Sequence, residues 1–224
     1  SFNPMQSIGG WFGRQVDMED LKANWDTEFA NGFPYNWNNN FHDNPFFNVN
    51  NNTNSRKKDR LFGNFNATYK FHDWLKAMVR VGNDWSYEKR MELTYNKSNS
   101  TLTSMANRTW GGGKFKQRSY GLNEMNLDFI LSRAGNLTPD LNLSYTAGGN
   151  YRDYKYEYDL IGADQLTVPN LFRIGNAKGS PVTGMSTQHL RSNSLFGQVS
   201  LGYKDALYLD LTARNDWNST LPVG

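Results

Sequence analysis

Apolar and polar residues alternate with a period of two along six stretches of the chain. In the second stretch, for example, Leu75, Ala77 and Val79 alternate with Lys76 and Arg80. Alternation of this kind places the two sets of side chains on opposite faces of a β-strand. The pattern predicts six antiparallel strands, at about residues 58–71, 74–88, 115–132, 140–156, 190–203 and 206–216.

The connections between these strands are alternately short and long. Short turns join the strands in pairs and so predict three hairpins. Long loops are expected at residues 88–114 and 157–189, and a further loop begins at residues 215–224. Residues 1–55 are expected to form a long loop that contains one short helix near 17–31. All the long loops should therefore emerge on the same side of the sheet.

Strand length and the placement of aromatic residues favour a transmembrane β-barrel. Tyr69, Phe71 and Trp74 lie near a short turn, whereas Trp85 and Tyr87 lie at the other end of the next strand. About ten residues at ~3.3 Å rise and ~40° tilt span roughly 25 Å, the height of the apolar band on such barrels. The alternative is a soluble β-sandwich that holds glycan on its aromatic loops, because such a sandwich also alternates apolar and polar residues.

Composition fits a barrel segment better than an ordinary soluble core. The chain is polar, with a mean hydropathy of -0.74, yet 15% of its 224 residues are aromatic. A barrel explains both values, because half of the residues of each strand face a water-filled lumen and aromatic residues gather at the two membrane interfaces. Six strands cannot close a barrel, since the smallest have about eight and lipid tolerates no open edge. We therefore expect an interior part of a longer polypeptide, or one chain of a split one.

Two blocks of sequence resemble hairpins of the SusC/RagA-type TonB-dependent transporters. The first runs from Arg60-Leu61-Phe62-Gly63-Asn64 to Arg80-Val81-Gly82-Asn83-Asp84. The second runs from Leu195-Phe196-Gly197-Gln198-Val199 into Arg214-Asn215-Asp216-Trp217-Asn218-Ser219-Thr220-Leu221-Pro222, which is the most specific signal. Two loop motifs also fit the family, Asn44-Pro45-Phe46 and Val168-Pro169-Asn170-Leu171-Phe172.

The resemblance implies a 22-stranded barrel in the outer membrane of Bacteroidetes, closed by an N-terminal plug on which TonB pulls. It also implies a SusD-like surface lipoprotein as the partner that captures oligosaccharides or peptides with the barrel. The resemblance covers only the middle of such a barrel, so the plug domain is expected to be absent from this chain. Oligosaccharide is favoured over peptide by the aromatic content and by the 29 asparagines.

Aromatic and amide side chains of the long loops are the candidate ligand contacts. Aromatic rings suit the apolar faces of sugars, and amides suit their hydroxyl groups. The other interpretation of these residues is loop packing or contact with the lipoprotein. The candidates are Trp37, Asn38, Phe46, Trp110 and Phe172.

Charged residues recur on the strand face that is expected to line the lumen. They would guide substrate or contact the plug, or else form ion pairs between neighbouring strands. These residues are Arg80, Asp84, Glu124, Asp128, Arg152, Asp210 and Arg214.

Other chemistry finds little support in the sequence. No nucleophile elbow or phosphate-binding loop is present, so we expect no enzyme. Asp17, Glu19 and Asp20 offer oxygens for Ca²⁺ but lack an EF-hand pattern, and the start of a helix explains them better. The net charge of +3 is too dispersed for a nucleic-acid surface. The one basic cluster, Arg56–Arg60, suits either anionic outer-membrane lipid or a solvated strand end.

Overall fold

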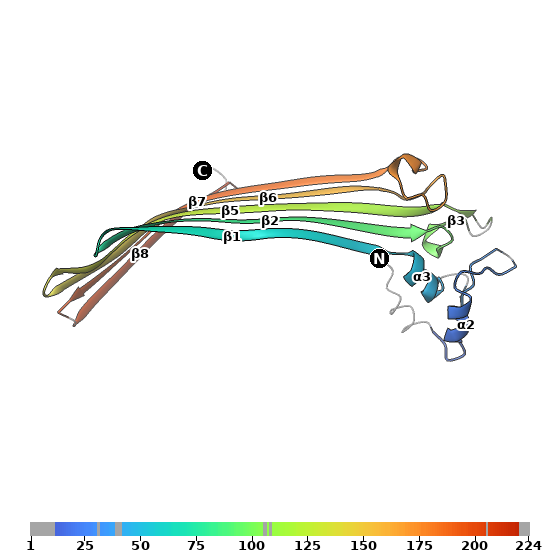
Figure 1. Ribbon diagram of the computed structural model, residues 1–224, viewed down its shortest axis with the longest axis horizontal. Coiled ribbons are helices and arrows are strands. Elements are labelled where there is room, and N and C mark those ends of the chain that lie inside the picture. Colours follow the sequence, from blue (N-terminus) through green and yellow to red (C-terminus); the bar gives the residue numbers. More distant parts are fainter. Residues whose placement is uncertain are drawn as a thin grey trace. The chain divides into compact units, whose positions relative to one another are not determined.

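The computed structural model describes residues 12–30, 32–38, 42–104, 107, 109–204 and 206–219. Six long strands form one sheet in the order β1-β2-β5-β6-β7-β8, so each strand pairs with its neighbours in sequence (Figure 1). This mostly antiparallel sheet confirms the predicted fold class. The strands are β1 (Asn54–His72), β2 (Leu75–Tyr95), β5 (Gly113–Thr138), β6 (Leu141–Ala163), β7 (Val182–Tyr203) and β8 (Leu207–Asn218). Two further short strands, β3 (Leu102–Ser104) and β4 (Thr109–Trp110), pair with each other.

Most strands are longer than the alternation predicts. Strand β2 continues to Tyr95 and β6 to Ala163, while β7 begins at Val182, so the expected loops 88–114 and 157–189 are shortened at their ends. Side-chain alternation marks only the stretch where one face is apolar. The backbone ladder does not depend on which side chains it carries, so it continues after that stretch ends.

Contacts along the chain define two compact units. The loop unit comprises Ser1–Lys57, Glu88–Ser119 and Tyr158–Met185, and the strand unit comprises Lys58–Tyr87, Tyr120–Glu157 and Ser186–Gly224. The long loops and all short helices belong to the loop unit, whereas the short turns belong to the strand unit. The two units are described in turn.

The strand unit has one apolar face and one polar face. On the apolar face, Leu61 is 72% exposed, Val79 40% and Leu209 52%. A soluble sandwich would bury these side chains against a second sheet. Within the described residues the second sheet is the β3–β4 pair, which belongs to the loop unit. The sandwich alternative is therefore not supported.

Helix α2 (Met18–Ala23) of the loop unit is much shorter than the predicted helix at 17–31. It begins as expected, because the carboxylate of Asp17 accepts hydrogen bonds from the backbone N–H groups of Glu19 and Asp20, at 2.9 and 3.2 Å. It ends early because the side chain of Asn24 donates to the carbonyl of Asp20 at 3.0 Å. The chain then turns back on itself, with Glu28 bridged to Pro34.

A second helix, α3 (Pro45–Asn51), lies where the sequence predicted a loop. Asn44 caps it by accepting a hydrogen bond from the N–H of Phe46 at 2.9 Å, and Pro45 occupies the first helical position. Asparagine and proline favour turns, but they are also preferred at these two helix positions. The Asn-Pro pair here starts a helix, which the asparagine-rich composition had obscured.

The apolar core of the described residues is small and lies in the loop unit. Phe115, Ala163 and Leu166 are buried, with Phe172 and Met91 packed against them. A search of the described residues for a helix long and apolar enough to cross a membrane finds none.

Asn44 offers a test of how the loop unit is held together. Its side chain is fully buried, caps α3 and donates to the carbonyls of Leu21 at 2.8 Å and Tyr35 at 3.1 Å. Replacing Asn44 by Ala should destabilise the unit locally by about 1–3 kcal/mol, because it removes a cap and leaves two carbonyls unpaired. Hydrogen exchange of α3 in the full-length protein measures this. Asn50→Ala, at an exposed position of the same helix, is the control and should leave exchange unchanged.

Candidate functional site

The polar face of the strand unit carries ion pairs between neighbouring strands. Arg60 on β1 binds both carboxylate oxygens of Asp84 on β2, at 2.9 and 2.6 Å. Asp128 on β5 accepts from Arg80 on β2 at 2.6 Å and from Asn150 on β6 at 2.7 Å. The Asp128 side chain is only 10% exposed, so these two donors replace the water that it loses.

The remaining predicted charges of this face also have protein partners. Glu124 on β5 accepts from Arg152 on β6 at 2.7 Å. Asp210 accepts from the hydroxyl of Ser200 on the neighbouring strand. Arg214 donates to Asp216 two residues along its own strand and to Ser194 across the ladder, both at 3.0 Å. All seven residues named from the sequence therefore take part in polar contacts. Five of them belong to ion pairs between neighbouring strands, whereas Asp210 bonds a serine and Arg214 pairs along its own strand.

The candidate aromatic residues of the loop unit pack against other rings. Trp37 stacks on His42 with centroids 4.9 Å apart and also contacts Phe12 at 4.8 Å. Asn38 follows it in the chain and is half-buried. Phe46 lies in the first turn of α3. The two ring contacts hold Trp37 in place, and Trp37, Asn38 and Phe46 each stay partly exposed.

Trp110 and Phe172 occupy different surroundings. Phe172 contacts Tyr95 at 5.1 Å and Phe115 at 6.4 Å, so it belongs to the small core. Trp110 meets the edge of Phe33 at 5.5 Å, which brings it to the 32–38 segment that also carries Trp37. The indole N–H of Trp110 is buried without an acceptor among the described residues. Trp110 as a whole is only half-buried, so its ring, and not the buried N–H, is the part that faces outward.

Many loop asparagines are used within the protein. Asn52 accepts from the N–H of Tyr95 at 2.8 Å, and Asn170 accepts from that of Asn96 at 2.7 Å. Asn176 binds Val168 through both its N–H and its carbonyl, at 2.9 and 2.8 Å. Amide side chains at these positions satisfy loop backbone groups that have no strand partner.

Asp43 links two loop segments by hydrogen bonds. Its carboxylate accepts from the N–H of Asn99 and from the hydroxyl of Ser98, both at 2.6 Å. Burial raises the pKa of Asp43 above its ordinary value, and these two donors only partly offset the shift. The segment before α3 is thereby tied to the short 3-10 turn η1 (Asn99–Thr101).

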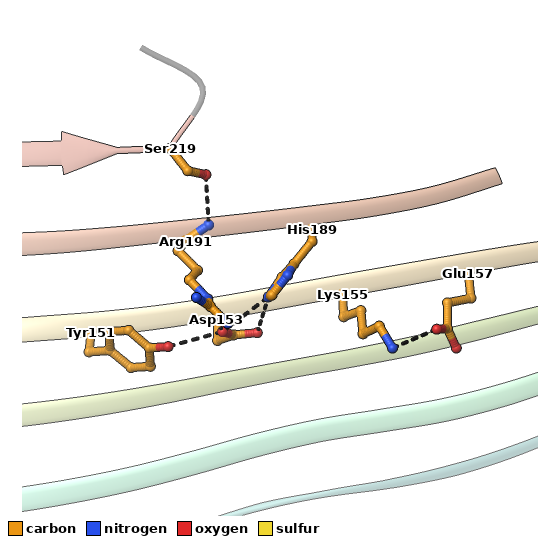
Figure 2. A network of polar contacts seen from close by, with 7 residues as sticks. All are labelled: Tyr151, Asp153, Lys155, Glu157, His189, Arg191 and Ser219. Atoms are coloured by element: carbon orange, nitrogen blue, oxygen red, sulfur yellow. Dashed lines mark hydrogen bonds and ion pairs between the residues drawn. The ribbon is translucent and has the colours of Figure 1, made fainter. Parts of the chain in front are cut away.

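A polar network on the apolar-face side of the strand unit was missed by the sequence reasoning. Asp153 on β6 accepts from Arg191 on β7 at 2.9 Å, from His189 at 3.0 Å and from the hydroxyl of Tyr151 at 3.0 Å (Figure 2). The alternation of the sequence did contain a sign of this network. Residues 151, 153, 189 and 191 share the parity of the apolar residues on their strands, yet they are polar or charged.

Known protein families and curated proteins give no match to this sequence. Solved structures do match in fold. One is a RagAB peptide transporter structure, with a TM-score of 0.68 and 14% identity over 81% of this chain and 20% of that chain. Two others are the RagAB peptide importer in its closed-closed and open-open states, with TM-scores of 0.64 and 0.61, 15% and 16% identity, and 79% coverage of this chain.

The resemblance to RagA-type transporters named from the sequence is thereby confirmed for the fold. At these identities the likeness concerns the fold alone. This chain spans 19–20% of the length of those transporter chains, so it corresponds to a part of their barrel.

The raised pKa of Asp43 predicts a pH dependence. Because its folded-state pKa lies above the ordinary value of 3.8, its contribution to stability is fully present below that pH. The contribution is lost as pH rises through the folded-state pKa. Protection of the Asn99 amide from hydrogen exchange, corrected for intrinsic rates, should therefore fall over this range. Asp43→Asn should flatten the profile, and an unchanged profile would contradict the assignment.

Proposed function

We propose that this chain forms part of the wall of a TonB-dependent importer in the outer membrane. The observation that carries the proposal is a single six-stranded sheet with an exposed apolar face, an ion-paired polar face and the fold of a RagA barrel segment. In this arrangement the apolar face meets lipid and the polar face meets the lumen. The protein acts in transport and not in catalysis.

The exposed aromatic residues indicate where the two membrane interfaces lie in this proposal. Tyr69, Phe71 and Trp74 are exposed near a short turn, and Trp85 and Trp217 are exposed farther along their strands. Tyrosine and tryptophan favour the interface between hydrocarbon and water because each combines an apolar ring with a polar group. The short turns then belong to the periplasmic side and the long loops to the cell surface.

The ion-paired face suits a watered lumen. Its named charges all have polar partners, and Asp128, the most buried of them, has two, so the face offers a hydrophilic surface. Such pairs contribute little stability singly, about 0–1 kcal/mol each. Their proposed role is to keep the lumen surface hydrated and to contact the plug domain, through which TonB acts.

The loop unit is the proposed capture surface. A surface lipoprotein of the SusD type is the partner that the resemblance implies, and the similarity to RagAB structures supports such a partner. Trp37, Asn38, Phe46, Trp110 and Phe172 are proposed to contact the cargo or this partner. Trp110 leads this set because it is half-buried against Phe33, in the 32–38 segment that also carries Trp37.

Two cargo classes are each favoured by one observation. The aromatic loop residues suit an oligosaccharide. The fold likeness to peptide importers favours a peptide. The internal use of Asn52, Asn170 and Asn176 leaves fewer free amides for sugar hydroxyls and so weakens the first argument. We propose a polar oligomer as cargo, and the binding experiment below separates the two classes.

The membrane placement predicts opposite responses of neighbouring residues on β2. Val79→Lys places a charge on the lipid face and should cost about 2–4 kcal/mol of folding stability in a bilayer. Met78→Lys, one residue away on the lumen side, should cost much less. Urea titration of the full-length protein folded into vesicles measures both. Equal costs, or a native full-length protein that is extracted without detergent, would overturn the transporter proposal.

The capture surface predicts a loss of affinity on removal of loop aromatics. Trp110→Ala should weaken cargo binding about 5–30-fold, as truncation of a buried aromatic contact commonly does. Trp74→Ala, at a short turn of the strand unit, is the control. Calorimetric titration of the purified full-length complex with oligosaccharide and peptide mixtures gives the affinities and shows which class binds. Unchanged affinity in Trp110→Ala would assign that residue to loop packing.

A further inference from the structure

A hollow of 970 Å³ lies on the apolar face of the strand unit, over β5, β6, β7 and β8. Small residues gather there, since Gly149, Gly197 and Ala213 all line it and Gly197 lies directly opposite Ala213 in the ladder. Larger side chains that include Phe129 and Trp217 border them. Glycine and alanine project little from the backbone, so the surface is recessed where they meet. The volume is at the upper end of the range for small-molecule sites, about 300–1,000 Å³.

Tyr151 connects this hollow to the polar network of Figure 2. Its ring lines the hollow, and its hydroxyl donates to Asp153 at 3.0 Å. Asp153 in turn binds Arg191, whose side chain is 59% exposed, whereas that of Asp153 is only 23% exposed. An apolar recess therefore runs into a group of charged side chains. Tyr151 and Trp217 lie where the two meet, as is typical of residues at a membrane interface.

We propose that this place binds one phosphorylated acyl lipid of the outer leaflet. An acyl chain occupies the hollow, and the phosphate accepts hydrogen bonds from the guanidinium of Arg191. The inference rests on the proposed function, because it requires this face to meet lipid. It goes beyond that function by assigning a specific lipid site to Arg191 and to the small residues of the hollow.

The chemistry of Arg191 favours a phosphate as the polar group. A guanidinium has five N–H donors in a planar fork, and the bond from its Nε to Asp153 at 2.9 Å uses one of them. The fork matches two oxygens of a phosphate, and Asp153 holds it in place before the lipid arrives. The ring Nε2 of His189 lies 3.0 Å from the same carboxylate and so helps to hold Asp153, which leaves Arg191 as the donor to the phosphate.

The hollow favours a hydrocarbon chain as the other part of the ligand. Its central residues, Gly149, Gly197 and Ala213, offer no polar side chain, and its borders include Leu127 and Leu195. Where a lipid-facing surface is recessed, a straight acyl chain lying against the protein leaves a gap between itself and the surface. A chain that enters it recovers dispersion contacts with the walls.

A photo-crosslinking experiment tests the proposal. The full-length protein is folded into vesicles that contain phosphatidylglycerol with a diazirine on its acyl chain, irradiated and digested, and the labelled peptides are located by mass spectrometry. Labelling should concentrate on segments 147–151, 193–197 and 213–217. A diazirine diacylglycerol, which lacks the phosphate, should label these segments about tenfold less, because hydrogen bonds to a charged group are lost.

Two variants probe the two halves of the site. Gly197→Leu fills the hollow, and the backbone allows it, since a Cβ at this position would meet only the Thr146 carbonyl oxygen, at 3.8 Å. It should lower labelling of the three segments about fivefold or more. Gly63→Leu is the control, because Gly63 lies on the same face of β1 with nothing within 4 Å of its added Cβ. Arg191→Gln should abolish the preference for phosphatidylglycerol, whereas Lys89→Gln, at an exposed position of β2, should retain it.

The outcomes separate this inference from the proposed function. Labelling spread evenly over the apolar face, including Leu61 and Val79, would show bilayer contact without a site and overturn only the lipid proposal. Equal labelling by the two probes would overturn the phosphate contact. Absence of label from the entire apolar face would overturn the membrane placement as well. Concentrated labelling that both Gly197→Leu and Arg191→Gln reduce would support the site.

Discussion

The backbone ladder between neighbouring strands is the constraint on which the rest of this structure depends. Each of the six long strands pairs with the next long strand in sequence, so the hydrogen-bonding groups between them are satisfied without a conventional core. The side chains are then free to serve two different environments. This explains how Leu61 and Leu209 can be exposed on one face while Arg80 and Asp128 pair on the other. In lipid the ladder must also be complete, because no water is present to replace a missing partner.

The same ladder carries residues to places that their sequence separation conceals. Arg80 and Asp128 are 48 residues apart, and Asp153 and Arg191 are 38 apart, yet each pair lies on neighbouring strands. The recess beside Tyr151 likewise arises from small residues on three strands, which no single stretch of sequence displays. The loops are held together differently. Their backbone groups have no neighbouring strand to pair with, so asparagine side chains such as that of Asn44 hydrogen-bond to them instead.

Sequence reasoning succeeded where a repeated pattern was long and failed where a local signal had two meanings. The six strands and their two faces follow from alternation, because successive side chains of a strand point to opposite sides. The three hairpins follow from the short turns. The helix expected at 17–31 ends at Ala23, because Asn24 caps a chain that the apolar spacing would have continued. Helix α3 was missed because Asn44 and Pro45 serve a helix start as well as a turn. For the candidate site, the sequence indicated which aromatic residues lie in the loops, but not which residues they contact.

The sequence by itself determined the strand pattern, the opposition of apolar and polar faces, and the family that the chain resembles. Only the tertiary structure decided which charges meet, that Trp110 packs against Phe33, and that Gly197 lies opposite Ala213 beneath a recess. The physical reason is that alternation fixes the face of a residue from its own strand. Register and loop packing depend on residues far along the chain, and these set every contact between strands.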